Sequence, residues 1–82
     1  MLTVKHQEDN GRESVYSAVS THFEPATDDQ FAMLFVHRRV NGDDDAQISS
    51  GLVYVMNDSG KTVAVYGQGG RHHNWAPLLG VP

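Results

Sequence analysis

Residues 31–39 have the sequence Phe-Ala-Met-Leu-Phe-Val-His-Arg-Arg, the strongest candidate in the chain for a core β-strand. Side chains alternate between the two faces of a strand, so Phe31, Met33 and Phe35 share one face, and Ala32 and Leu34 lie on the other. Apolar residues on both faces favour a central strand that is covered on both sides. We therefore expect Leu34 and Phe35 both to be buried.

Turn signals divide the rest of the chain into further strands. Asn10-Gly11 and Asn41-Gly42 are hairpin signals, because both residues of such a pair tolerate positive φ. A third turn is expected at 57–60, and Gly51 predicts a bulge or bend within its strand. The alternating segments between these turns predict four more strands, at 1–6, 12–24, 47–56 and 61–66.

The segment 12–24 fits two secondary structures. Val15, Ala18, Val19, His22 and Phe23 have helical spacing, which favours an amphipathic helix. The serines, valines, threonine and tyrosine of the segment are poor helix formers, and a preceding Asn-Gly turn favours a second strand. We favour the strand, whose shared face would comprise Val15, Ser17, Val19, Thr21 and Phe23.

The expected fold is all-β or mostly β: a small twisted antiparallel meander of about five strands, able to curl into a half-barrel. Residues 1–66 would form the antiparallel sheet domain. Residues 67–82 would form an irregular C-terminal segment that begins with glycines and packs on the sheet or on a partner. The glycines at 67–70 lack the following helix that a phosphate-binding loop needs.

Composition limits the classes of function. A chain of 82 residues forms one domain with a thin stability margin, and the lack of cysteine excludes disulfides and thiolate chemistry. The net charge of −4 disfavours direct nucleic-acid binding. No apolar run is long enough for a membrane span, and residues 1–7 lack the pattern of a secretion signal, so we expect a cytoplasmic protein.

None of the motifs that commonly carry chemistry is complete. A calcium loop that began at Asp43 would need glutamate at its twelfth position, which is Tyr54. His22 and His37 lie on neighbouring predicted strands, but no convergent third ligand is visible, and the adjacent His72-His73 point apart on an extended chain. We therefore predict no catalytic residue, no metal and no cofactor.

Two features remain as candidate partner contacts. The acidic turn of Asp43, Asp44 and Asp45 would either blunt a sheet edge or dock on a basic surface. Trp75, the only tryptophan, would either fold back over the sheet or anchor the C-terminal segment on another chain.

These features favour a small non-catalytic protein-interaction module. A phage or mobile-element accessory protein that binds and inhibits a host protein fits the size and the acidity. The first alternative is a structural or oligomer-forming subunit, such as a homodimer that uses sheet edges and the C-terminal segment. The second is a small-ligand binder or an enzyme with its site at a dimer interface.

Overall fold

The computed structural model describes residues 1–41, 44–69 and 75–79. Within these ranges every regular element is a strand and every paired strand is antiparallel, so the predicted all-β class is confirmed. In chain order the strands are β1 (Leu2–Gln7), β2 (Glu13–Ala18), β3 (Ser20–Glu24), β4 (Met33–His37), β5 (Ala46–Ile48), β6 (Leu52–Met56), β7 (Thr62–Gln68) and β8 (Trp75–Leu79).

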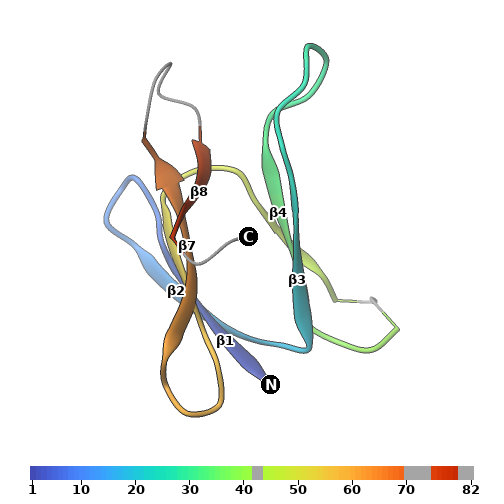
Figure 1. The fold of residues 1–82 in the computed structure, drawn as a ribbon, viewed down its shortest axis with the longest axis vertical. Helices are drawn as coiled ribbons and strands as arrows, with labels where there is room; N and C mark the ends of the chain where they lie inside the picture. The colour runs from blue at the N-terminus through green and yellow to red at the C-terminus, as the bar shows by residue number, and fades with distance from the viewer. Residues whose placement is uncertain (42–43, 70–74, 80–82) are drawn as a thin grey trace.

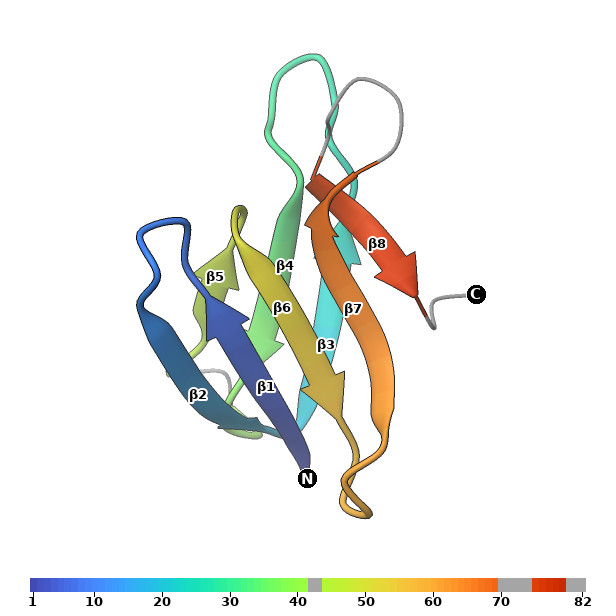
Figure 2. The same ribbon diagram turned by 90° about the vertical axis from the view of Figure 1, so that its left-hand side faces the viewer.

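The strands form two sheets that lie in two layers (Figure 1; Figure 2). Sheet A has the order β2-β1-β6-β7-β8, and sheet B has the order β3-β4-β5. Strands that follow each other through a hairpin are hydrogen-bonded to each other, as in a meander. In addition, β1 pairs with β6, and Val4 lies opposite Val55 in this pair. Among the described strands the two sheets stay separate and do not close into a barrel.

The predicted strand at 12–24 bends at Val19 and serves both sheets. Its first half is β2 in sheet A and its second half is β3 in sheet B, so the strand prediction is confirmed over the helix. At the bend, the amide of Val19 donates a hydrogen bond of 2.8 Å to the carbonyl of His37.

The bend also changes which side chains face inward. Before Val19 the inward side chains are Tyr16 and Ala18, and after it Phe23 packs against the core. The prediction that Val15, Val19 and Phe23 share one face is therefore wrong. The alternation shifts by one residue where the chain passes from one layer to the other.

A second bend, at Gly51, separates β5 in sheet B from β6 in sheet A. Gly51 has a φ of 82°, and a Cβ built on it would lie 2.4 Å from the backbone oxygen of Gln7. The bend predicted at this glycine is confirmed, because only glycine suits both the positive φ and the close approach of β1. Positive φ is likewise confirmed at Gly11, whereas Gly42 lies outside the described residues.

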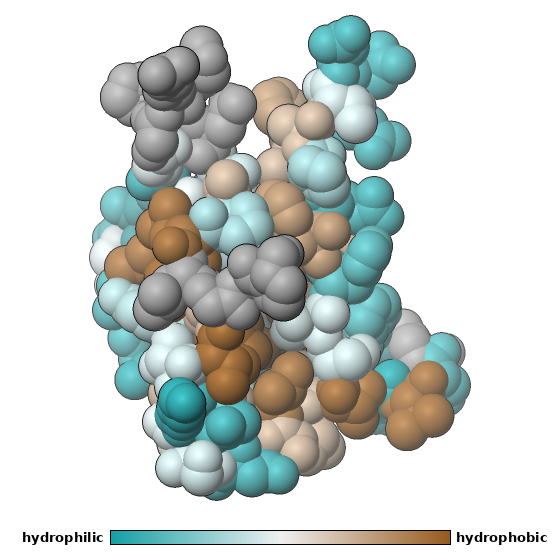
Figure 3. Space-filling model, in the orientation of Figure 1, coloured by the Kyte–Doolittle hydropathy of each residue, from teal (hydrophilic) through white to brown (hydrophobic). Residues whose placement is uncertain are grey.

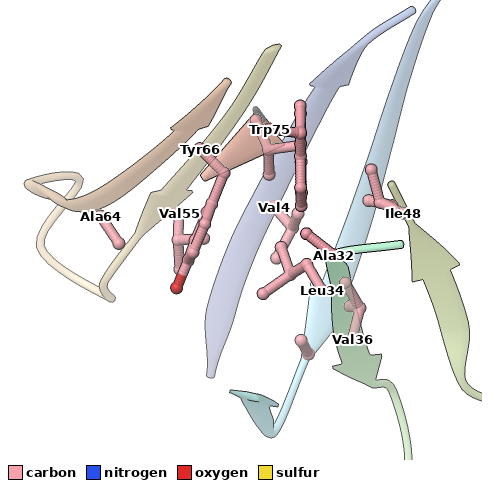
Figure 4. Close-up of a cluster of buried hydrophobic side chains, with 11 residues drawn as sticks. Val4, Ala32, Leu34, Val36, Ile48, Val55, Ala64, Tyr66 and Trp75 are labelled. Carbon is pink, nitrogen blue, oxygen red and sulfur yellow. The ribbon is translucent and has the colours of Figure 1, made fainter. Parts of the chain in front are cut away.

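One hydrophobic core fills the space between the layers (Figure 4). The least exposed large side chains come from both sheets: Val4, Val53 and Val55 from sheet A, and Leu34 and Val36 from sheet B. Each of them is β-branched or leucine, residues that pack well on a pleated surface. Because the two bent strands cross from layer to layer, the sheets share this single core.

The central strand β4 is buried on one face only. Leu34 is fully buried, as predicted, but Phe35 is only half-buried and Phe31 is 88% exposed. The prediction that both faces are covered is therefore wrong for the face with Phe31 and Phe35. In the described part of the chain, sheet A packs against the face of sheet B that carries Leu34.

The C-terminal segment contributes a strand that the sequence did not predict. Residues 75–79 form β8, which pairs with β7 along the edge of sheet A, and β7 itself extends to Gln68. Pro77 stands opposite Tyr66 in this ladder. Proline cannot donate a backbone hydrogen bond, and edge strands tolerate this loss. The same proline is why the sequence pattern did not indicate a strand here.

No described helix is long and apolar enough to cross a membrane.

Candidate functional site

The outer face of sheet B carries an exposed apolar surface, which we call the outer patch and define as Phe31, Met33 and Phe35. The inward side chains of the same segment, Ala32 and Leu34, lie in the core, so the strand period of two directs the outer patch to solvent. Large apolar side chains gathered on a protein surface commonly mark an interaction site.

The outer patch lines a hollow of about 450 Å³ on the protein surface. The other lining residues are polar: Glu24 at the end of β3, Gln30 before β4, and Gln47 on β5. Register explains this grouping, because Glu24 stands opposite Met33 and Gln47 stands opposite Phe35. The hollow thus combines two aromatic rings, a thioether, one carboxylate and two amides.

Glu24 and Phe35 both contact His22, which stands opposite Phe35 and two residues before Glu24 on β3. The Nε2 atom of His22 lies 3.0 Å from Oε1 of Glu24. Its ring also stacks on Phe35, with the centroids 6.2 Å apart. His22 therefore contacts two of the residues that line the hollow and engages one of the two oxygens of Glu24.

The connection between β3 and β4 forms an acidic tip next to the hollow. The Oγ1 atom of Thr27 accepts hydrogen bonds from the amides of Asp29 and Gln30, at 3.3 and 3.1 Å, so the turn is ordered. A second hollow at this turn is lined by residues 26–31, including Asp28 and Asp29. Figure 3 shows the hydrophilic tip of this connection at the upper right of the molecule.

The acidic turn proposed from the sequence lies against cations of this same chain. Asp44 is 3.4 Å from Arg38 and 3.9 Å from Arg39, and Asp45 is 2.6 Å from Nδ1 of His37. Asp43 lies outside the described residues. The charge of Asp44 is therefore partly balanced by the two arginines, which weakens its attraction for a basic partner, and Asp45 is engaged in a contact within the chain.

Trp75 lies inside the molecule, with 8% of its surface exposed. Its ring packs beside Tyr66 and Phe23, and its Nε1 donates a hydrogen bond of 2.8 Å to the carbonyl of Gly51. Burial raises the pKa of the neighbouring Tyr66 hydroxyl. The structure thus places Trp75 on the chain's own core and does not bring it together with the acidic turn.

The described histidines have separate partners. His22 contacts Glu24, His37 contacts Asp45, and the Nε2 of His6 lies 2.9 Å from the carbonyl of Ser50. Within residues 1–41, 44–69 and 75–79, no three metal-ligating side chains gather into one cluster. His72 and His73 lie outside these ranges.

Sequence reasoning missed the outer patch as a site. It grouped Phe31, Met33 and Phe35 correctly on one face but assigned that face to the core. A signal was available, since the facing positions on the neighbouring strands are His22, Glu24 and Gln47, three polar residues that suit a solvated face.

Comparison of the chain with protein-family models, curated proteins and solved structures found no match.

Proposed function

We propose that this chain is a non-catalytic protein-interaction module and that the outer patch is its contact surface. The observation that carries the proposal is the exposure of Phe31, which is 88% accessible beside the half-buried Met33 and Phe35. Exposing a large aromatic side chain in this way gains the isolated protein nothing, whereas burying it against a partner is strongly favourable. Aromatic anchors of this kind dominate the affinity of many interfaces.

The charges around the outer patch support a partner with a basic surface. Glu24 lies on the hollow, and Asp28 and Asp29 lie on the adjacent acidic tip. Such rim charges mainly accelerate association with a positively charged protein. One biological setting that fits a small acidic module is a phage or mobile-element accessory protein that inhibits a host protein.

Site-specific photocrosslinking tests this assignment. A benzophenone amino acid is placed at Phe31 in one protein and at Val40, which is 96% exposed, in the matched control. We expect the Phe31 position to crosslink one protein from the native extract and the Val40 position not to do so.

Affinity measurements with the purified crosslinked partner complete the test. Phe31→Ala should weaken binding by about tenfold or more, whereas Val40→Ala should leave it unchanged. Equal crosslinking and equal affinities at the two positions would contradict the proposal.

A homodimer is a second candidate, favoured by the outer face of sheet A. Leu52 and Leu78 each have a methyl carbon 3.0 Å from a Cβ built on Gly67, so both side chains lie close to this glycine, and Leu78 is exposed. Two such faces could pack together. A dimer predicts a melting temperature that rises with protein concentration and is made independent of concentration by Leu78→Asp.

A further inference from the structure

The hollow beside the outer patch has the chemistry of a receptor for one cationic side chain. We propose that it binds an arginine side chain presented by the partner protein, with the guanidinium lying against Phe31 and Phe35 and paired with Glu24. This inference rests on the proposed function, because it names the group that the contact surface recognises.

The lining residues match a guanidinium group in each of its properties. Aromatic faces attract a cation through the ring quadrupole, and the hollow has two phenylalanine rings. A carboxylate forms a strong charge-assisted pair with arginine, and Glu24 has a second oxygen besides the one near His22. The side-chain carbonyls of Gln30 and Gln47 can accept from the remaining N–H groups.

Arginine fits better than lysine or an apolar anchor. The guanidinium is planar and more weakly hydrated than an ammonium, so it stacks on rings at a lower desolvation cost. An aliphatic anchor would offer no hydrogen bond to the second oxygen of Glu24 or to the two amides, and burying them in this way is unfavourable. The volume of about 450 Å³ lies in the lower part of the range of small-ligand sites, which suits one long side chain.

The electrostatic surroundings favour a positive occupant. Among the residues that the structure describes, those that line this hollow and the adjacent one include Glu24, Asp28 and Asp29 but no lysine, arginine or histidine. Arg38 and Arg39 form ion pairs with Asp44, which lies in the other acidic turn. An anionic ligand would therefore be repelled at the hollow by these carboxylates, one of whose oxygens contacts His22, whereas a cation is attracted.

The test uses two capped peptides, Ala-Arg-Ala and Ala-citrulline-Ala, titrated into the ¹⁵N-labelled protein. Citrulline has nearly the shape of arginine but carries no charge, and a carbonyl oxygen, which accepts, replaces one of the donating NH2 groups. We expect saturable amide shifts at Phe31, Phe35 and Gln47 with the arginine peptide, at millimolar concentration, and none with the citrulline peptide. Equal shifts with both peptides, or no saturable shift with the arginine peptide, would overturn the proposal.

A matched pair of variants assigns the role of the carboxylate. Glu24→Gln and Glu13→Gln each remove one negative charge, but only Glu24 lines the hollow. We expect Glu24→Gln to raise the dissociation constant of the arginine peptide by about tenfold and Glu13→Gln to change it by less than twofold. A similar loss in both variants would indicate attraction by the net charge alone and would contradict a built site.

The outcome also separates this inference from the proposed function. Crosslinking at Phe31 without arginine binding would keep the contact surface and remove the cation receptor. Arginine binding without crosslinking at Phe31 would keep the receptor and remove the interaction module. The isolated peptide titration needs no knowledge of the partner, so either result is decisive for the hollow.

Discussion

Leu34 and Phe35 are neighbours with similar hydrophobicity, yet they lie on opposite faces of β4. Leu34 is fully buried in the core, whereas Phe35 lines the surface hollow. We expect Leu34→Ala to lower the free energy of unfolding by roughly 2–5 kcal/mol, because it leaves a cavity between the sheets. Phe35→Ala should cost only about 1 kcal/mol. Urea unfolding followed by circular dichroism measures both, and equal losses would contradict the assignment of faces.

Gly11 and Gly51 separate two reasons for needing glycine. Both have positive φ, at 89° and 82°, but a Cβ on Gly11 would meet nothing within 4 Å, whereas one on Gly51 would collide with the backbone of Gln7. Gly11→Ala should therefore cost only the backbone strain, about 1–2 kcal/mol. Gly51→Ala should cost clearly more, because β1 must also move. Thermal unfolding of the two variants checks this order, and equal losses would argue against the close approach of β1 to the bend.

The hydroxyl of Tyr66 makes stability depend on alkaline pH. Burial raises its pKa in the folded protein above the value of about 10 in the unfolded chain. Above pH 10 the unfolded state releases this proton before the folded state does, so stability falls as pH rises through that region. Tyr66→Phe should remove this part of the loss, whereas Tyr54→Phe should retain it. Denaturant midpoints between pH 9 and pH 11 provide the measurement, and identical profiles for the two variants would contradict the assignment.

At the scale of elements, alternation and turn signals were sufficient to predict the strand segments up to β7 but not β8 or the two layers. The hairpin positions and the strand character of 12–24 followed from Asn-Gly pairs and from residue types. The bend at Val19 did not, because no glycine or proline marks it and its side chain resembles those around it. Which face of β4 is covered depends on which strands bend from one sheet into the other. For the same reason, the sequence did not reveal that the outer patch is exposed.

The edge strand β8 depends on a single aromatic residue. Trp75 packs on Tyr66 and Phe23 and donates a hydrogen bond to the carbonyl of Gly51, so it links β8 to β7, to β3 of sheet B and to the bend at Gly51. Trp75→Ala should lower the free energy of unfolding by roughly 3–5 kcal/mol. Trp75→Phe should cost less, since it retains most of the packing and loses the hydrogen bond. Partner affinity per folded molecule should not change in either variant, and a selective loss of affinity without a loss of stability would place Trp75 at the interface instead.

At the scale of the whole molecule, the net charge is less informative than its distribution. The sequence contains 10 acidic and 6 basic residues, which predicts a basic partner but not where it binds. The fold pairs Arg38 and Arg39 with Asp44, whereas none of the described residues that line the acidic tip beside the outer patch is a lysine or arginine. The acidic turn was the visible feature in the sequence, whereas the unbalanced charge lies on the β3–β4 connection. Only the structure distinguishes the acidic turn from the β3–β4 connection in this respect.

The shared core predicts that both sheets unfold together. Trp75 is the only tryptophan and lies on the edge strand β8 of sheet A, so its fluorescence reports on that sheet and on its contact with Phe23 of β3, whereas circular dichroism reports on all strands. Ile48→Val, on β5 of sheet B, removes one buried methylene and should cost roughly 0.5–1.5 kcal/mol. Because Ile48 belongs to the same core cluster as Trp75, the fluorescence midpoint in urea should fall as far as the dichroism midpoint, by about half a molar or more. Val55→Ala in sheet A is the reciprocal control and should move both midpoints together. A fluorescence midpoint that stays fixed while the dichroism midpoint falls would mean that sheet A is stable without sheet B, and that the core between them is not one cooperative unit.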